Sequence, residues 1–393
     1  MKLPDYINPN CTHWKSSSPC IYQRSTDTTG CLECPKVSPI SDQTPTDIGG
    51  RLDFRSIAKN IGSTAIIEAG GLGSVLRTTA VSKAINSINP EIDIALVTHK
   101  RGVNLAKYIP EIAYAIELDT SDFEENYFDY TINFEHDTRC VPILNRSRII
   151  AGFAINSCGK FYPANQNSLY LQRIHIDDNF RKKNKLTMQQ VLLQTAGIYD
   201  DHPSYSLKIN TYSRATNTFF KTQTGYTIPD NFISINTGTS ERGKVKRWPT
   251  NNIIKLSQKL SADGITSVLL CGPDEQNLKE ELSGAISNNI HLISFTDDDL
   301  EHFLRIIKLS KLVVSGDTFG AHAAFALNTP TIILNGPAPY RELEVVGDRD
   351  IAIGPFLDCW PCFYRCPLTD KGMCMNMISV DMVYNSVIAH YTH

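Results

Sequence analysis

The chain has 393 residues, of which 41% are hydrophobic and 20% charged, and its formal net charge is −3. This length predicts roughly two or three domains that each bury a core, and the nearly neutral charge argues against nucleic-acid binding. No run of about 18 apolar residues is present, so no transmembrane segment is expected. The residues from Met1 to Asp5 lack the apolar stretch of a secretory signal, and we therefore expect a cytoplasmic protein.

The first stretch of the chain, residues 1–50, is rich in Ser, Thr, Pro and Cys and has no hydrophobic periodicity. Because it has little apolar content, we expect an arm that needs its cysteines in order to fold. Two domains are expected after the arm, over residues 51–227 and 228–393. A loop-rich stretch over 200–228 would join them.

The first domain begins with a strand–helix–strand pattern. The apolar run 63–67 is followed by Gly70-Gly71-Leu72-Gly73, by a helical pattern over 75–88 and by a strand over 92–97. This order is typical of a parallel sheet. The stretch 160–184 is polar and weakly patterned. Further elements expected in this half are strands over 128–134 and 149–155 and a helix over 187–198.

The second domain alternates strands and helices regularly, which is a strong indication of an α/β fold. The expected strands cover 232–236, 266–271, 291–295, 312–315 and 331–334. The expected helices cover 251–260, 276–286, 299–307 and 320–327.

Ligands of open parallel sheets bind beyond the carboxyl ends of the strands, at helix amino termini. The strand over 312–315 is followed by Gly316-Asp317-Thr318-Phe319-Gly320-Ala321-His322. Small residues there let backbone N–H groups approach a diphosphate, and the following helix points its positive dipole end at it. His322 could donate to a phosphate or stabilise departing negative charge. A plain capped turn would explain the same residues.

Two more strand ends carry groups suited to a nucleotide. The strand over 232–236 is followed by Thr237-Gly238-Thr239-Ser240 and then by Lys244-Val245-Lys246-Arg247-Trp248-Pro249, where hydroxyls and a lysine could bind phosphate. The strand over 266–271 is followed by Gly272-Pro273-Asp274-Glu275, whose acidic groups suit a ribose or sugar hydroxyl. A solvated basic turn would explain the first cluster taken alone, and a capped turn would explain the second. Together they favour a nucleotide diphosphate site.

With these motifs the sequence resembles glycosyltransferase family nine, the bacterial heptosyltransferases of lipopolysaccharide assembly. The resemblance extends over nearly all of residues 62–388. The early cysteines also resemble a cysteine-bearing extension found in part of this family. The matching strings are Gly71-Leu72-Gly73-Ser74-Val75-Leu76-Arg77-Thr78-Thr79, Lys246-Arg247-Trp248-Pro249, Gly272-Pro273-Asp274-Glu275, Asp317-Thr318-Phe319-Gly320-Ala321-His322, Asn335-Gly336-Pro337 and the Cys-x-x-Cys block from Cys359.

The resemblance implies a GT-B fold, in which two Rossmann-like domains face each other across a cleft. It further implies that the first domain takes the acceptor and the second the sugar nucleotide, and that the transfer inverts the anomeric centre without a catalytic metal. The suggested donor is ADP-heptose, and the acceptor could be a glycan, a lipid-linked sugar or a protein, with peripheral contact to the inner membrane possible. By motif position, the groups that would contact the donor diphosphate and sugar are Thr239, Ser240, Lys246, Asp317, Thr318, Gly320 and His322, and either Asp274 or Glu275 would hold the nucleoside.

The general base is the main departure from the family. Ser74 occupies the position of the Asp that serves as base in the family, and a serine hydroxyl needs another group to take its proton. Glu68 is our candidate for that role, and an ordinary strand-end carboxylate is the alternative. Other candidates follow the strand over 128–134, namely Glu135, His136 and Asp137.

Two other functions remain open. The Ser74 substitution also fits a catalytically impaired protein of the same fold that binds a sugar nucleotide or assists assembly. A nicotinamide dehydrogenase ranks last, because Gly70-Gly71-Leu72-Gly73 is not the Gly-x-Gly-x-x-Gly fingerprint.

Basic side chains of the first domain could favour an anionic acceptor, although a solvated basic surface is an equal alternative. They are Arg77, Lys83, Lys160, Arg173 and the run Arg181-Lys182-Lys183-Asn184-Lys185.

Eight of the eleven cysteines form two clusters, each with a Cys-x-x-Cys pair that lets two thiolates face one ion. Structural zinc or iron and disulfides both fit these spacings, and one site drawing on both clusters is a further alternative. Neither cluster is expected to be catalytic. The early cluster comprises Cys11, Cys20, Cys31 and Cys34, and the late cluster Cys359, Cys362, Cys366 and Cys374.

Overall fold

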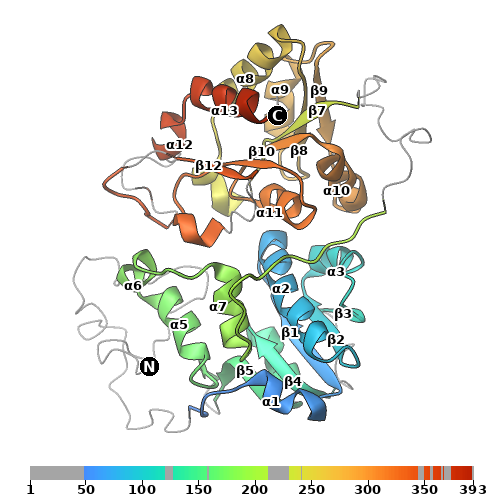
Figure 1. The fold of residues 1–393 in the computed structure, drawn as a ribbon, viewed down its shortest axis with the longest axis vertical. Coiled ribbons are helices and arrows are strands. Elements are labelled where there is room, and N and C mark those ends of the chain that lie inside the picture. The colour runs from blue at the N-terminus through green and yellow to red at the C-terminus, as the bar shows by residue number, and fades with distance from the viewer. Residues whose placement is uncertain are drawn as a thin grey trace. The chain divides into compact units, whose positions relative to one another are not determined.

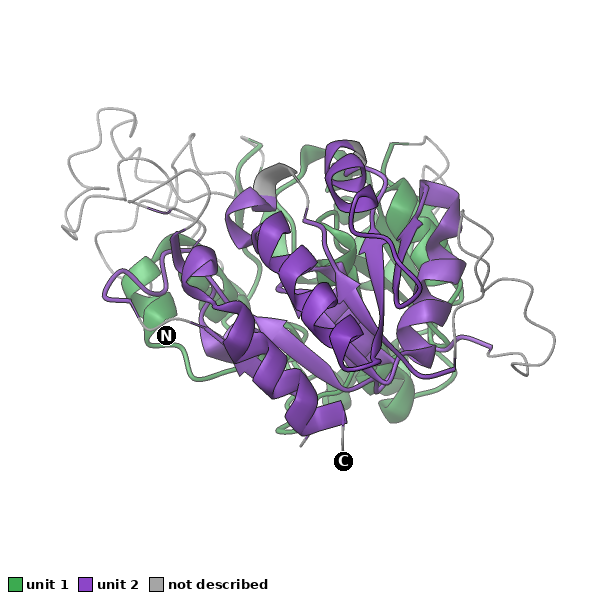
Figure 2. Ribbon diagram, turned by 90° about the horizontal axis from the view of Figure 1, so that it is seen from above, with its two compact units in different colours: residues 1–206 green, residues 207–393 purple. Residues whose placement is uncertain are grey.

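The computed structural model describes residues 48–119, 127–156, 159–210, 230–239, 241–343, 349–354, 357–363, 366 and 373–391. The chain divides into two compact units, Met1–Ser206 and Leu207–His393 (Figures 1 and 2). The four early cysteines and nearly all of the expected arm lie outside the described residues. No helix in the described ranges is long and apolar enough to cross a membrane.

The first unit contains a six-stranded sheet in the order β3-β2-β1-β4-β5-β6. Neighbouring strands run parallel, except that β6 is antiparallel to β5. Its core includes Ala65 and Ile67 of β1 with Ala95 and Val97 of β2. The strands are β1 (Ser63–Ile67), β2 (Asp93–Thr98), β3 (Tyr114–Glu117), β4 (Phe128–Asn133), β5 (Ser147–Ile155) and β6 (Phe161–Pro163).

Helices of this unit begin where local signals allow. The helix α2 (Leu72–Ile88) starts three residues earlier than the apolar pattern predicts, directly after the extended Gly71. Thr187 and Gln190 form a capping box at the start of α7 (Met188–Thr195), which packs on α2 and α5. The other helices are α1 (Phe54–Ile57), η2 (Ala58–Asn60), α3 (Lys100–Ala106), η3 (Thr138–Cys140), α4 (Val141–Leu144), α5 (Ser168–Ile176) and α6 (Asp178–Lys182).

The second unit contains a six-stranded, fully parallel sheet in the order β12-β11-β10-β7-β8-β9. Its strands have nearly continuous apolar burial, as expected when helices cover both faces. The strands are β7 (Phe232–Asn236), β8 (Thr266–Cys271), β9 (Ile290–Ser294), β10 (Leu312–Gly316), β11 (Thr331–Leu334) and β12 (Ile351–Ile353).

Two groups of helices cover this second sheet. Helix α8 (Thr250–Ala262) packs against α9 (Gln276–Ser283) and α13 (Val380–Tyr391), and α10 (Leu300–Leu309) packs against α11 (Phe319–Ala326) (Figure 1). The shorter segments are η6 (Glu241–Lys246), η7 (Asp297–Asp299), η8 (Tyr340–Leu343) and α12 (Met373–Met377).

Counted from the first strand of each unit, both sheets have the order 3-2-1-4-5-6 of the Rossmann fold. The expectation of two Rossmann-like α/β domains is therefore confirmed. In each sheet the order reverses between the first and fourth strands, β1 and β4 in one unit and β7 and β10 in the other. Crevices at such reversals are where ligands of open α/β sheets bind, so these two strand edges are the places to look for a site.

Candidate functional site

In the second unit, the reversal between β7 and β10 brings together three polar residues from two stretches of chain. Lys246 Nζ donates to the Asp317 carboxylate at 2.9 Å and to the Asp317 carbonyl oxygen at 3.0 Å. The other carboxylate oxygen of Asp317 lies 3.6 Å from His322 Nε2. Asp317 and His322 are only 5% and 3% exposed, so this lysine–aspartate–histidine group is largely desolvated. Interactions of charged groups are strengthened in such surroundings.

The first turn of α11 lies directly against the end of β7. Asn236 Nδ2 donates to Ser315 Oγ at 3.1 Å and to Thr318 Oγ1 at 2.8 Å, which ties the two strand ends together. A Cβ added at Gly320 would lie 2.7 Å from Asn236 Cγ, so only glycine permits this approach. Thr318 is the extended N-cap of α11, and its side chain makes no capping hydrogen bond to the helix. The helix therefore begins at the strand reversal with its positive dipole end there.

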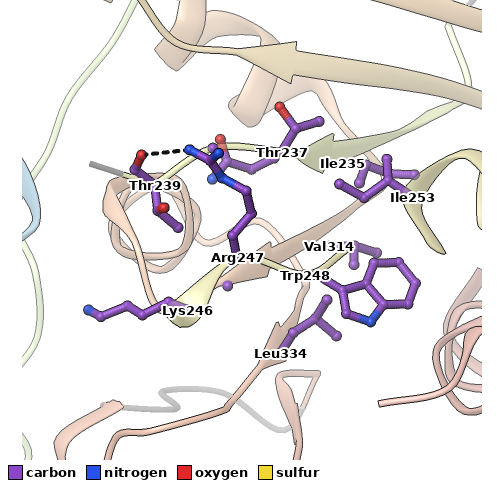
Figure 3. Close-up of a pocket in the computed structure, with 12 residues that line it drawn as sticks. Ile235, Thr237, Thr239, Lys246, Arg247, Trp248, Ile253, Val314 and Leu334 are labelled. Atoms are coloured by element: carbon purple, nitrogen blue, oxygen red, sulfur yellow. Dashed lines mark hydrogen bonds between the residues drawn. The ribbon is translucent and has the colours of Figure 1, made fainter. Parts of the chain in front are cut away.

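A small pocket adjoins this group (Figure 3). Its apolar wall includes Ile235 and Leu334, and its polar side includes Thr239, Lys246 and Arg247. An Arg247 guanidinium nitrogen donates to the Thr239 carbonyl oxygen at 3.3 Å, whereas Lys246 extends in another direction. The buried Thr239 hydroxyl oxygen has no hydrogen-bond partner among the described residues. An unpaired buried hydroxyl is costly, so it is suited to receive a ligand group.

The two acidic candidates after β8 differ in their surroundings. Glu275 is buried, accepts the Gly272 N–H at 2.8 Å and lies 3.8 Å from Arg247, whereas Asp274 is exposed. Burial raises the pKa of Glu275, and the Gly272 N–H and the Arg247 charge oppose that shift. A Cβ added at Gly238 would lie 1.7 Å from Glu275 Oε1, so the carboxylate lies directly over the chain leaving β7.

The structure therefore gathers Lys246, Asp317 and His322, with Thr318 and Gly320 beside them and Thr239 and Glu275 at the neighbouring strand ends. Ser240 lies outside the described residues. Two participating residues, Asn236 and Arg247, were not among the predicted site residues. A polar residue ending the first strand and an arginine adjacent to Lys246 are the signals that point to them.

In the first unit, Glu68 and Glu135 meet at the reversal between β1 and β4. Their carboxyl groups bind neighbouring backbone N–H groups of one turn, and each affects the pKa of the other. Glu68 Oε1 accepts the Gly70 N–H at 2.8 Å and Glu135 Oε1 accepts the Ala69 N–H at 3.1 Å. Burial, followed by the Glu135 charge, raises the pKa of Glu68 well above its usual range, and burial also raises the pKa of Glu135.

Ser74 lies in the same place, because a Cβ added at Gly70 would be 2.5 Å from Glu68 Oε1 and 3.2 Å from Ser74 Oγ. The two other base candidates have different surroundings. His136 stacks on Phe153 with ring centroids 3.8 Å apart, and burial lowers its pKa to about 2. Asp137 accepts from Arg139 Nε at 3.0 Å, and this contact lowers the pKa of Asp137.

Two of the basic residues considered for acceptor binding have other partners. Lys83 Nζ donates to Ser204 Oγ at 2.7 Å. Arg173 lies over the Phe180 ring at 4.2 Å and pairs with Asp177 at 3.5 Å. Arg77 is near enough to Glu68 for its charge to oppose the rise in that residue's pKa.

The late cysteines are thiols that lie near one another. Burial raises the pKa of Cys374 to about 11, and the charges of Cys362, Cys366 and Cys359 add to this shift. Within the part of the chain that the structure describes, no three His, Cys, Asp or Glu side chains are grouped so as to hold an ion.

Comparison with known proteins agrees with this arrangement. The profile of "Glycosyltransferase family 9 (heptosyltransferase)" matches residues 157–371, which is more than half of the chain. The protein is thus a glycosyltransferase with two Rossmann-like domains. It belongs to glycosyltransferase family nine, the heptosyltransferase family. A search of curated proteins found no match.

Three solved structures illustrate the similarity of fold. ADP-heptose lps heptosyltransferase II of E. coli aligns over 84% of this chain and 98% of its own, with 15% identity and a TM-score of 0.65. E. coli heptosyltransferase WaaC with ADP-2-deoxy-2-fluoro heptose covers 83% and 99%, with 13% identity and a TM-score of 0.52. The dodecameric, iron-containing heptosyltransferase TibC of enterotoxigenic E. coli H10407, in its complex with ADP-D-beta-D-heptose, covers 84% and 76%, with 12% identity and a TM-score of 0.54.

Proposed function

We propose that this glycosyltransferase moves a heptose-like sugar from a nucleoside diphosphate donor, with inversion, to a hydroxyl of a glycan, lipid-linked or protein acceptor. The observation that carries the proposal is the buried group of Lys246, Asp317 and His322 at the β7–β10 reversal. Structural relatives with ADP-heptose and its 2-fluoro analogue support the choice of donor. These relatives are 13% and 12% identical to this chain, so a donor screen has to identify the sugar and the nucleobase.

The second unit would bind the donor. Lys246 and the first N–H groups of α11 would stabilise the diphosphate, and His322 would stabilise the charge that develops as it leaves. Asp317 would orient Lys246 and contact the sugar. Further contacts would come from Thr239, Ser240, Thr318 and Gly320, and the nucleoside would be held by Glu275 or Asp274.

The first unit would take the acceptor and supply the base. Glu68 would accept the proton of the attacking hydroxyl, either directly or through Ser74, whose oxygen lies beside it. The acceptor oxygen forms a bond to the anomeric carbon while the bond from that carbon to the diphosphate oxygen breaks. The nucleoside diphosphate leaves with that electron pair. No step requires a metal.

Calorimetric titration with ADP and an assay of ADP release from ADP-heptose test this proposal together. Lys246→Ala should weaken donor binding by about tenfold to a hundredfold, because a charge-assisted hydrogen bond is worth roughly 1.5–3 kcal/mol. Lys259→Ala is the matched control, since Lys259 pairs with Asp381 on the exposed side of α8 and α13. Equal donor affinity and turnover in the wild type and Lys246→Ala would refute the assignment.

A catalytically impaired, sugar-nucleotide-binding protein is the second candidate, and the presence of Ser74 where the family has an aspartate favours it. Such a protein would bind ADP-heptose and release no ADP with any acceptor. Mass spectrometry of a panel of glycan, lipid-linked and peptide acceptors after incubation with the donor separates the two candidates.

We also propose a cytoplasmic location and the domain limits 51–227 and 228–393.

We further propose that the cysteine clusters hold a structural zinc or iron ion. The proximity of the late thiols and the iron-containing TibC support the ion. As placed, the described cysteines do not form a ligand set, so binding would have to draw them together or add early cysteines. Elemental analysis of chelator-free protein tests this, and less than one metal per chain with all eight cysteines paired would favour disulfides.

A further inference from the structure

The fold brings two glutamates together that are far apart in the sequence. Strands β1 and β4 are parallel neighbours with Ile67 opposite Asn133; Glu68 is the next residue after Ile67, and Glu135 is the second residue after Asn133. Asn133 holds the backbone of Glu135 by accepting its N–H at 3.0 Å and donating to its carbonyl oxygen at 3.0 Å. The backbone around both carboxyl groups is thus tied to the sheet.

The two carboxyl groups are also held by the same short turn. The Gly70 N–H binds Glu68 and the Ala69 N–H binds Glu135, so each carboxyl group keeps one oxygen on the backbone. The two carboxyl groups are therefore neighbours, and burial followed by the charge of Glu135 raises the pKa of Glu68. Ionised carboxylates only accept hydrogen bonds, so a bond between two of them requires a proton on one. The two neighbouring groups can therefore share a hydrogen bond once one of them has taken up a proton.

Other charged groups face this pair from every side. Arg77 of α2 is the cation whose charge favours ionisation of Glu68. The pKa of Glu135 is raised mainly by burial, and the negative charge of Asp137 adds to this rise. The Cys140 thiol lies near both glutamates and near Arg139. His99, between β2 and α3, accepts the Gly102 N–H at 3.3 Å, and burial lowers its pKa, which favours the neutral imidazole. The charge of Glu135 opposes ionisation of Glu68, and Arg77 offsets part of that effect.

We propose that Glu135 is a positioning residue for Glu68, which receives the acceptor's proton into a hydrogen bond shared with Glu135. This inference rests on the proposed function. In the active state both groups are ionised, and the repulsion between them makes Glu68 a stronger base. The acceptor hydroxyl then gives its proton to Glu68, the two glutamates share that proton, and one negative charge departs with the diphosphate. A base whose pKa lies near the working pH is the most effective.

The pH dependence of kcat/KM for sugar transfer tests the role of Glu135. The wild type should gain activity as pH rises through a value above the usual carboxyl range. We call this rising part of the pH profile its limb. In Glu135→Gln this limb should move down by about one pH unit or more, because a like charge near Glu68 has been removed, and turnover on the plateau should fall. The matched control is Glu91→Gln, an exposed glutamate in the turn before β2, which should leave the limb in place.

A second measurement does not depend on turnover. An infrared titration of the carboxyl C=O band should show a buried carboxyl that titrates well above the usual range in the wild type. That band should shift to lower pH in Glu135→Gln and be absent in Glu68→Gln. An unchanged limb and an unchanged band in folded Glu135→Gln would overturn the inference. A wild type without transferase activity would refute the proposed function instead, and the infrared titration would still decide whether the two glutamates share a proton.

Discussion

The ion pair between Lys246 and Asp317 allows a quantitative prediction. The two side chains are 20% and 6% exposed and their charged atoms are 2.9 Å apart. Removing one member of a fully buried pair costs about 3–5 kcal/mol, because the other charge remains without compensation. Since water can reach part of the Lys246 side chain, we expect Lys246→Met to lower the free energy of unfolding by about 2–3 kcal/mol.

This loss corresponds to a fall in Tm of roughly 5–10 °C for a unit of this size. The double variant Lys246→Met/Asp317→Asn carries no unpaired charge, so it should lose less stability than the sum of the two single variants, by about 1 kcal/mol or more. All three variants should bind ADP more weakly.

Urea unfolding followed by tryptophan fluorescence measures these stabilities, because Trp248 is buried beside Lys246 and donates to the Ile378 carbonyl oxygen at 2.9 Å. Calorimetric titration of ADP with the same variants measures binding. Strictly additive losses in the double variant would refute the argument, since they would mean that the two charges do not stabilise each other. Normal ADP affinity in all three variants would show that this ion pair is not part of the donor site.

Three further outcomes follow from particular contacts. Gly320→Ala should lower the free energy of unfolding in urea by about 1–3 kcal/mol and weaken ADP binding, because the added Cβ would lie 2.7 Å from Asn236 Cγ. A variant with wild-type stability and wild-type ADP affinity would contradict this close approach. The folded-state pKa of Glu68 is raised, so its contribution to stability is present below the unfolded-state pKa and is lost as pH rises through the folded-state pKa. Glu68→Gln should therefore be more stable than the wild type at about pH 8 and similar at about pH 4 in thermal unfolding, and a pH-independent difference would count against a raised pKa. Thr187→Ala removes the capping box of α7 and should lower the free energy of unfolding by about 1 kcal/mol with donor binding unchanged, whereas a loss of ADP affinity would point to a wider rearrangement.

Elements with a strong apolar pattern were predicted well from the sequence. The bounds of β7, β8 and β11 agree with the predicted strands, because these strands are buried in a parallel sheet and most of their residues are apolar. The short edge strands β3, β6 and β12 and the helix α5 were missed. Edge strands of three or four residues carry little periodicity, and α5 lies in a polar stretch whose buried positions include Gln172.

By itself, the sequence determined the alternation of strands and helices, the family, and the polar residues that follow each central strand. It could not determine which strand ends are neighbours, because strand order depends on how the crossover helices pack on the two faces of a sheet. Only the tertiary structure placed Lys246 on Asp317, across 71 residues of chain, and Glu135 beside Glu68. The raised pKa values of the two glutamates also arise only in the folded chain, because burial and a neighbouring carboxyl group change a pKa only once the chain has folded.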